Sequence, residues 1–173
     1  MRVTIERIAS PVSWEIAKIS VSLEGIGVVY GLSLRNTKAG DIWLAPPSVK
    51  TKDGYQNVVL LNGKLRAEIL DTAKTMKDGD KNTIEYDPLG DTPMAVYINP
   101  YSGDKSLLAM GSVTVKNVVS VNSCTLRRKG EGMIFNMPGF ESKGKIYHYL
   151  ALEKAVYAKV QSEAADCYKT KTA

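Results

Sequence analysis

The sequence predicts an α+β protein made of two similar units, each an antiparallel β-meander of about five strands with one C-terminal helix packed on the sheet. Short segments alternate polar and apolar residues with period two, which is typical of strands with one buried face. An apolar helical stripe follows the last strand of each unit, and the same order of elements occurs twice. With 173 residues, 44% of them apolar, the chain has the composition of a globular protein.

The first unit begins with three predicted strands, at Arg2–Ala9, Ala17–Leu23 and Val28–Arg35. In the second of these, every other residue from Ala17 onward is apolar, so one face is expected to be buried. Gly25 and Gly27 lie in the turn that follows, and this turn predicts an antiparallel hairpin with the third strand.

A short strand at Ile42–Ala45 is expected to end at Pro46 and Pro47, because proline cannot donate to a neighbouring strand. The polar stretch Ser48–Gly54 is interpreted as a loop. The next segment, Gln56–Leu61, is predicted to be the last strand of the unit.

A helix is predicted after this strand, with Asn62 as its N-cap. The segment beyond the helix is rich in Asp, Asn, Gly and Pro and has no regular periodicity, which predicts a linker. We therefore divide the chain into unit one at residues 1–79, a linker at 80–92 and unit two at 93–173. The apolar stripe of the helix consists of Leu65, Ile69, Ala73 and Met76.

The second unit repeats the order of the first. A shift of 91 residues places Ile42–Pro47 over Met133–Pro138, and a shift of 92 places Leu32–Arg35 over Cys124–Arg127. The alternative is a chance alignment of two unrelated meanders, but the proline after the short strand and the helix after the last strand favour a repeat. The predicted elements are strands at 94–99, 107–115, 118–128 and 133–136, a loop at 138–145, a strand at 146–151 and a helix at 152–167.

The net charge of +5 lies entirely in the second half of the chain. Residues 1–92 hold 12 basic and 12 acidic residues, whereas residues 93–173 hold 11 basic and 6 acidic residues. This asymmetry favours a polyanionic partner such as nucleic acid, although +5 is also an ordinary charge for a soluble protein.

Basic residues cluster in the predicted loops and strand ends, where the turns at one end of a meander converge. We predict a basic rim that contacts phosphates without reading bases; the alternative is an ordinary solvated surface. The nucleic-acid-binding residues of this rim are Lys50, Lys52, Arg127, Arg128, Lys129, Lys143 and Lys145.

Aromatic residues offer a second means of binding. Tyr147 and Tyr149 alternate on one predicted strand, where they either pack in the core, the interpretation we favour, or stack on bases. Trp14 and Trp43 are interpreted as core or interface anchors, and His148 as a structural or surface hydrogen-bond donor.

Enzymatic and metal-binding sites are not expected. The chain has two cysteines and one histidine, and zinc sites or nucleophile–base pairs need such residues in clusters. It has no phosphate-binding glycine motif, so we expect no cofactor, and we interpret Cys124 and Cys167 as packing residues. No stretch approaches the roughly 18 apolar residues of a membrane helix, and the N-terminus lacks a signal-peptide core, so a cytoplasmic protein is expected.

The run from Ile42 to Tyr55 resembles the signature of SpoVG-like proteins, small bacterial regulators of septation and sporulation. That signature is a hydrophobic strand followed by Pro-Ser, basic residues, Thr, and Asp-Gly with an aromatic residue close behind. The second unit looks like a degenerate copy. The matching residues are Pro47, Ser48, Lys50, Thr51, Asp53 and Gly54 in unit one, and Pro138, Ser142, Lys143 and Gly144 in unit two.

The resemblance implies a regulator that binds DNA or RNA, with two units paired inside one chain as family protomers pair between chains. It leaves the nucleic-acid type and the sequence specificity open. The alternative is a phage or mobile-element interaction protein that sequesters a host protein or a small nucleotide signal. Exposed sheet edges could also support homo-oligomers or the addition of a partner's strand.

Overall fold

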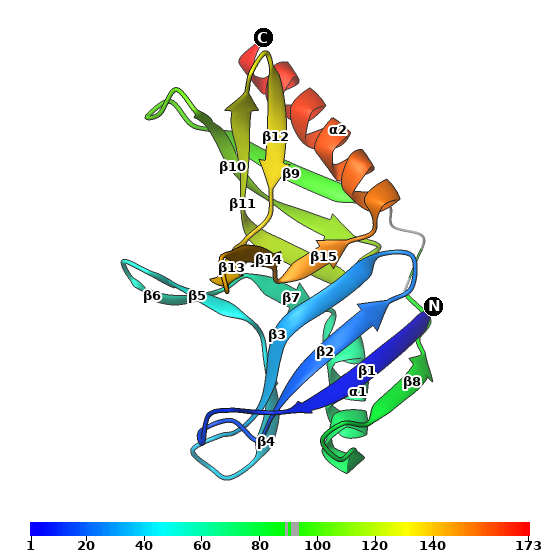
Figure 1. Ribbon diagram of the computed structural model, residues 1–173. Helices are drawn as coiled ribbons and strands as arrows, with labels where there is room; N and C mark the ends of the chain where they lie inside the picture. The colour runs from blue at the N-terminus through cyan, green and yellow to red at the C-terminus, as the bar shows by residue number, and fades with distance from the viewer. Residues whose placement is uncertain (89, 91–93) are drawn as a thin grey trace.

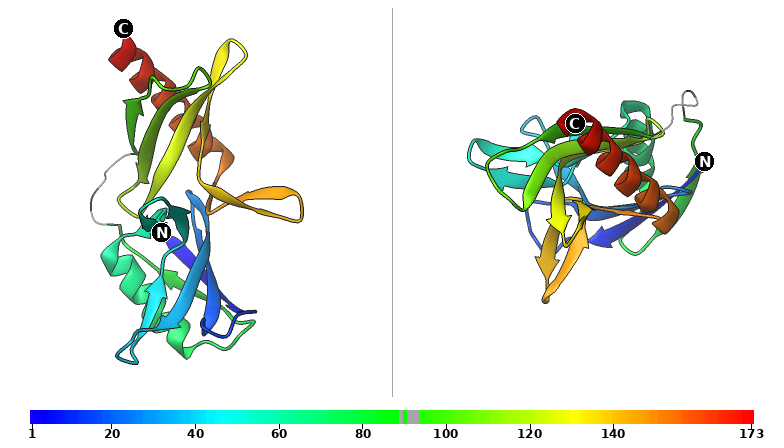
Figure 2. Two further views of the ribbon diagram at one scale, coloured as in Figure 1. Left: turned by 90° about the vertical axis from the view of Figure 1, so that its left-hand side faces the viewer. Right: turned by 90° about the horizontal axis from the view of Figure 1, so that it is seen from above.

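The computed structural model describes residues 1–88, 90 and 94–173 and is an α+β protein (Figure 1), which confirms the predicted class. Within these residues the chain forms two larger antiparallel sheets, two separate hairpins and two helices. The two larger sheets lie one above the other, and each carries one helix, so the molecule is elongated (Figure 2).

The first sheet has the strand order β15-β3-β2-β1-β8, with β4 paired to the same side of β3 as β15. The alternating segments form strands as predicted, and their apolar faces are buried. The segment 80–92, predicted as a linker, contains β8, which pairs with β1; residues 89 and 91–93 lie outside the described residues. The strands are β1 (Arg2–Ala9), β2 (Ala17–Leu23), β3 (Gly27–Asn36), β4 (Ile42–Ala45), β8 (Lys81–Glu85) and β15 (Leu150–Leu152).

The second sheet has the order β12-β11-β10-β9, with β7 paired to the same edge of β11 as β12. Its central strands again follow the predicted alternation. The strands are β7 (Val59–Leu61), β9 (Ala95–Pro100), β10 (Leu107–Val115), β11 (Val119–Lys129) and β12 (Gly132–Asn136).

Each sheet therefore contains one short strand from the other half of the chain: β15 joins the first sheet and β7 joins the second. We call β7 and β15 the exchanged strands. β4 covers only part of the edge of β3, and β15 occupies the rest; β12 and β7 divide the edge of β11 in the same way. The residue just after each of β7 and β15 makes the same kind of backbone hydrogen bond. Asn62 N donates to Val118 O, and Glu153 N donates to Ile26 O, both at 2.8 Å. The two halves share one continuous apolar core.

The helices α1 (Gly63–Thr75) and α2 (Lys154–Thr172) follow the exchanged strands directly. The predicted N-cap is confirmed, because the side chain of Asn62 accepts a hydrogen bond from Lys64 N at 3.0 Å. The predicted stripe of α1 is buried, and α2 packs across β9 and β12 (Figure 1). α2 extends five residues beyond its predicted end at Cys167, since the polar last turns carry no apolar signal.

Two segments predicted as loops are hairpins instead. β5 (Ser48–Thr51) pairs with β6 (Gly54–Asn57), and β13 (Gly139–Ser142) pairs with β14 (Lys145–His148). Their residues are mostly exposed on both faces, so they lack the alternation that identifies a half-buried strand. The single strands predicted at 56–61 and 146–151 are each broken, because Val58 N and Tyr149 N turn to donate to Pro47 O and Pro138 O.

Candidate nucleic-acid interface

The predicted basic residues lie in three places. Lys50 and Lys52 lie at the tip of the β5–β6 hairpin, and Lys143 and Lys145 lie at the tip of the β13–β14 hairpin. Arg127–Lys129 lie at the β11–β12 turn, which Figures 1 and 2 place at the far end of the second sheet, away from both hairpins. The two hairpins point in different directions from the middle of the molecule (Figure 2). The seven residues therefore lie in three separate places, two at the tip of each hairpin and three at the far end of the second sheet.

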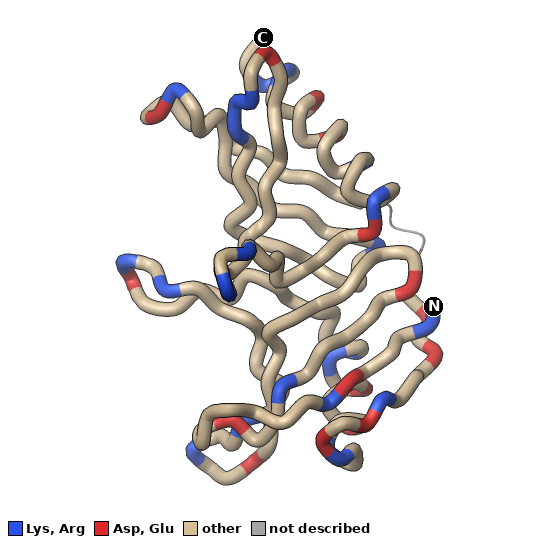
Figure 3. The backbone as a smooth tube through the Cα atoms, in the orientation of Figure 1, with Lys and Arg blue, Asp and Glu red and all other residues tan. Residues whose placement is uncertain are grey.

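All seven side chains are exposed. Among the described residues none of them forms an ion pair with a carboxylate, although each half of the chain contains paired cations elsewhere. Arg127 donates to the hydroxyl of Ser106 at 3.4 Å, and its charge is one of the causes, after hydrogen bonds from Ser106, that lower the pKa of Asp104. Figure 3 shows basic residues at both hairpin tips and along the upper part of β11. These cations are therefore available to an anionic partner.

A cavity of about 790 Å³ lies between the two hairpins and the first sheet. One wall comes from the first sheet and the β1–β2 connection, and the others come from the two hairpins and their bases. The volume is in the range of small-molecule sites, and aromatic side chains are prominent in the lining. The lining residues that bear on function are Trp14, Glu15, Lys18, Arg35, Tyr55, Phe140 and Tyr149.

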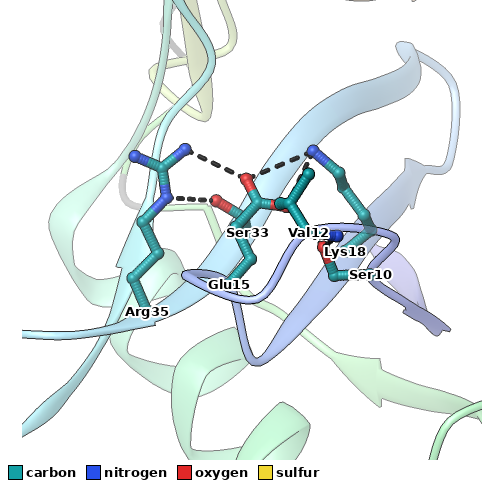
Figure 4. A network of polar contacts seen from close by, with 6 residues as sticks. All are labelled: Ser10, Val12, Glu15, Lys18, Ser33 and Arg35. Atoms are coloured by element: carbon teal, nitrogen blue, oxygen red, sulfur yellow. Dashed lines mark hydrogen bonds and ion pairs between the residues drawn. The ribbon is translucent and has the colours of Figure 1, made fainter.

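Glu15 anchors the charged wall of the cavity (Figure 4). Its carboxylate is only 1% exposed and lies 2.9 Å from Lys18 Nζ and 3.2 Å from Arg35 Nη2. The Ser10 hydroxyl donates to the same carboxylate at 2.8 Å. Burial by itself would raise the pKa of Glu15, but the hydrogen bonds from Lys18 and Ser10 and the charges of Lys18 and Arg35 outweigh it and lower that pKa. Glu15 is therefore ionised at neutral pH.

Arg35 is fixed on three sides. Its Nε donates to Ser33 Oγ at 2.8 Å, its Nη2 bonds to Glu15, and its guanidinium lies 4.4 Å from the ring centre of Trp14. Trp14 is itself 61% exposed, so the core interpretation of this residue is wrong. Trp43 is also exposed, at 39%, and lies outside the cavity. The Arg–Trp stack thus stands at the cavity wall with much of its surface open to solvent.

The aromatic wall is built on the second hairpin. Phe140 stacks on Tyr147 with ring centres 5.7 Å apart and meets Tyr149 at 5.2 Å. Tyr147 is exposed, so the predicted core packing is wrong for it, whereas Tyr149 is half-buried against the core. Tyr149 lies against Gly31, where a Cβ would stand 3.0 Å from the ring. Tyr55 reaches the cavity from the first hairpin and is 78% exposed.

Sequence reasoning missed Trp14, Glu15, Lys18, Arg35, Tyr55 and Phe140 as site residues. Trp14 and Glu15 precede a strand in a connection without periodicity, and nothing local shows that they face the second half of the chain. Cys124 packs in the core as predicted, and its burial raises the pKa of its thiol to about 12. His148 has the predicted structural role, since its Nδ1 makes a hydrogen bond with Met137 O at 3.0 Å.

The described residues contain no cluster of three or more His, Cys, Asp or Glu side chains placed to hold a metal ion. Within the same residues, neither helix is long and apolar enough to cross a membrane. The chain matches no protein-family model, no curated protein and no solved structure.

Proposed function

We propose that this chain is a non-enzymatic, regulatory protein that binds DNA or RNA, and that it contacts phosphates through the cations of its two hairpins and its β11–β12 turn. One observation carries the proposal. Lys50 and Lys52 on one hairpin, and Lys143 and Lys145 on the other, have no described carboxylate partner, and both hairpins contribute aromatic residues to the lining of one cavity. Unpaired cations beside exposed aromatic rings are the combination that single-strand-binding surfaces use.

The salt dependence of binding tests this proposal. Affinity for a labelled single strand of about 20 nucleotides is measured by fluorescence anisotropy between about 50 and 200 mM salt. Each phosphate contact adds roughly 0.7 to the slope of log affinity against log salt for a single strand. The double variant Lys143→Glu/Lys145→Glu is expected to lower affinity and to reduce the slope by about 1.4.

A matched control reverses two exposed cations outside the hairpins, Lys38→Glu and Lys77→Glu. This control changes the net charge by the same amount but is expected to keep the slope near that of the unaltered protein. A flat salt response, or an equal loss of slope in the control, would contradict the proposal.

We further propose that the two halves are copies of one SpoVG-like unit, interlocked as a pseudo-dimer. Positions that lie 91 or 92 residues apart make equivalent backbone hydrogen bonds, which supports this proposal. Tyr30 N donates to Tyr149 O at 2.7 Å, and Asn122 N donates to Val58 O at 2.8 Å. Residues 1–88 alone would lack β15, which pairs with β3. Sedimentation of this fragment should therefore show a dimer or a poorly folded chain. A folded monomer as stable as the whole chain would show that one half does not need the other, and would refute the proposal.

The cavity supports a second candidate function, capture of a small nucleotide signal. Its volume of about 790 Å³ is sufficient for a nucleotide, and Arg35 and Lys18 supply positive charge at its wall. A protein purified from its host with a bound mononucleotide, and without polymer that nuclease removes, would favour this candidate.

A further inference from the structure

The cavity between the hairpins brings together aromatic rings from three segments that lie far apart in the sequence. Trp14 comes from the β1–β2 connection, Tyr55 from β6, and Phe140 from β13. Trp14 and Tyr55 expose most of their surface to water, which is unfavourable for large apolar rings unless a ligand covers them. A concave site with several open rings suits a flat, apolar-faced ligand.

We propose that this cavity holds one unpaired nucleobase, stacked on the exposed aromatic rings, with the attached phosphate bound by Arg35 and Lys18. This inference depends on the proposed function in one respect: if the protein binds DNA or RNA, the base belongs to a strand, and otherwise it belongs to a free nucleotide. Stacking recognises the π-face that all bases share, so the site accepts any base. The cavity thereby adds a base contact to a surface whose hairpin cations contact only phosphates.

The charge at the wall matches a phosphate. Arg35 uses Nε for Ser33 and Nη2 for Glu15, while its Nη1 has no hydrogen-bond partner among the described residues and can still donate. Lys18 also has ammonium hydrogens beyond those that bond to Glu15. Two cations face one buried carboxylate, so the wall keeps one net positive charge.

Glu15 acts as a positioning residue. Because its carboxylate is buried and holds both cations, Arg35 is fixed over the Trp14 ring before any ligand arrives. A fixed guanidinium loses less rotational freedom on binding than a mobile one, which favours affinity. The same stack covers part of Trp14, so a base is expected to use the part of the ring that remains open.

The site selects against intact duplex. Bases within a duplex are stacked on their neighbours, and entry into the cavity would require one to leave the stack at a cost of a few kcal/mol. A single strand presents unstacked bases without that cost. The cavity therefore favours single-stranded segments or free nucleotides.

Trp14 emission tests the proposal directly. The chain has two tryptophans, and Trp43 lies outside the cavity, so the variant Trp43→Phe leaves Trp14 as the only reporter. Three probes are titrated: an oligouridylate of about ten nucleotides, an abasic oligomer with the same phosphates, and uridine monophosphate. The oligouridylate is expected to quench Trp14, and the abasic oligomer is expected to bind without quenching.

Alanine substitution measures the contribution of stacking. Trp14→Ala and Tyr55→Ala are each expected to weaken oligouridylate binding about 5- to 150-fold, the range that corresponds to base–aromatic stacking. Trp14→Phe should restore most of the affinity, because it keeps a ring. Ile146→Ala is the matched control, since Ile146 is 74% exposed at the equivalent position of the other hairpin and lines no part of this cavity.

Each outcome separates the base site from the proposed function. Quenching by oligouridylate with loss in both alanine variants supports both proposals. Salt-dependent binding without quenching and without loss in either variant overturns the base site alone. In a third outcome, uridine monophosphate quenches Trp14 and binds as tightly as the oligouridylate, and the affinity of the oligouridylate does not depend on salt. This outcome supports the base site and overturns the proposed function. Binding of no probe overturns both.

Discussion

The cavity can be compared with the corresponding position on the opposite side of the molecule. A shift of 91 residues exchanges Tyr55 for Ile146, Phe140 for Val49 and Tyr149 for Val58, so the second position has no aromatic ring from these three sites. The backbone nevertheless matches, because both sides carry a hairpin, an exchanged strand and the same hydrogen bonds to it. The scaffold is common to both sides, and the aromatic chemistry is present on one.

The strand bulges also combine a similar backbone on the two sides with different side chains. The β2–β3 pair has one register shift and the β10–β11 pair has two; Gly31 (φ 79°) lies at the shift in β3, and Ser123 (φ 59°) lies at the second shift in β11. Gly31 lies against Tyr149, whereas the residue equivalent to Tyr149 on the other side is the smaller Val58. The large ring on one side thus coincides with the residue that has no Cβ. The basic residues differ less, because Lys52 corresponds to Lys143 and Arg35 to Arg127.

The largest expected effect tests whether the two halves form one folding unit. Leu150→Ala, in the exchanged strand β15, removes a side chain that is 1% exposed and is expected to destabilise the protein by about 2–5 kcal/mol. Both tryptophans lie in the first half, so urea unfolding followed by their fluorescence reports whether a second-half residue stabilises the first half. Two separate transitions, with fluorescence unchanged in the variant, would show that the halves fold independently.

A second comparison uses the bulges. Gly31→Ala places a Cβ 3.0 Å from the Tyr149 ring and 3.1 Å from Pro47 at a positive φ, and is expected to cost about 2–4 kcal/mol. Ser123→Gly relieves the same backbone conformation on the other side and should stabilise by up to about 1 kcal/mol. Urea unfolding measures both. If Gly31→Ala does not destabilise the protein, or if Ser123→Gly destabilises it, the proposed difference between the two bulges is wrong.

The buried carboxylate gives a third test. Glu15→Gln is expected to cost about 2 kcal/mol at pH 7, because charge-assisted hydrogen bonds to Lys18 and Arg35 are lost. The pKa of Glu15 is lowered by folding, so its stabilising contribution is present above the ordinary value of 4.5 and is lost as pH falls through the lower folded pKa. Unfolding measured from pH 7 down to about 3 should show the two proteins converge. A constant difference would mean that the Glu15 charge contributes nothing.

The smallest effect concerns the opposite side. Ile146→Tyr adds a ring at an exposed position and should change the free energy of unfolding by less than about 0.5 kcal/mol. One ring without facing partners at Val49 and Val58 is not expected to create a second base site, so the stoichiometry of oligouridylate binding should stay the same. A doubled stoichiometry would show that a single ring is sufficient.

Much of the fold could be predicted because burial on one face is a local property of a strand. The strands at 42–45 and 107–115 have the predicted bounds, and the α1 stripe was assigned in full. The hairpins could not be recognised as strands, because residues such as Tyr55 and Ile146 are exposed on a two-stranded ribbon that has no buried face. Their turn lysines were found nonetheless, because a charged turn is visible in the sequence.

The sequence by itself determined the class of each main element and the position of the basic turns. The tertiary structure alone decided which edge accepts β7 and β15, since a three-residue strand does not encode its partner and instead fills the edge that short β4 and β12 leave open. That exchange carries Phe140 and Tyr149 to the wall formed by Trp14 and Arg35. Contacts between residues more than 100 positions apart depend on the packing of the whole chain, and no local pattern specifies them.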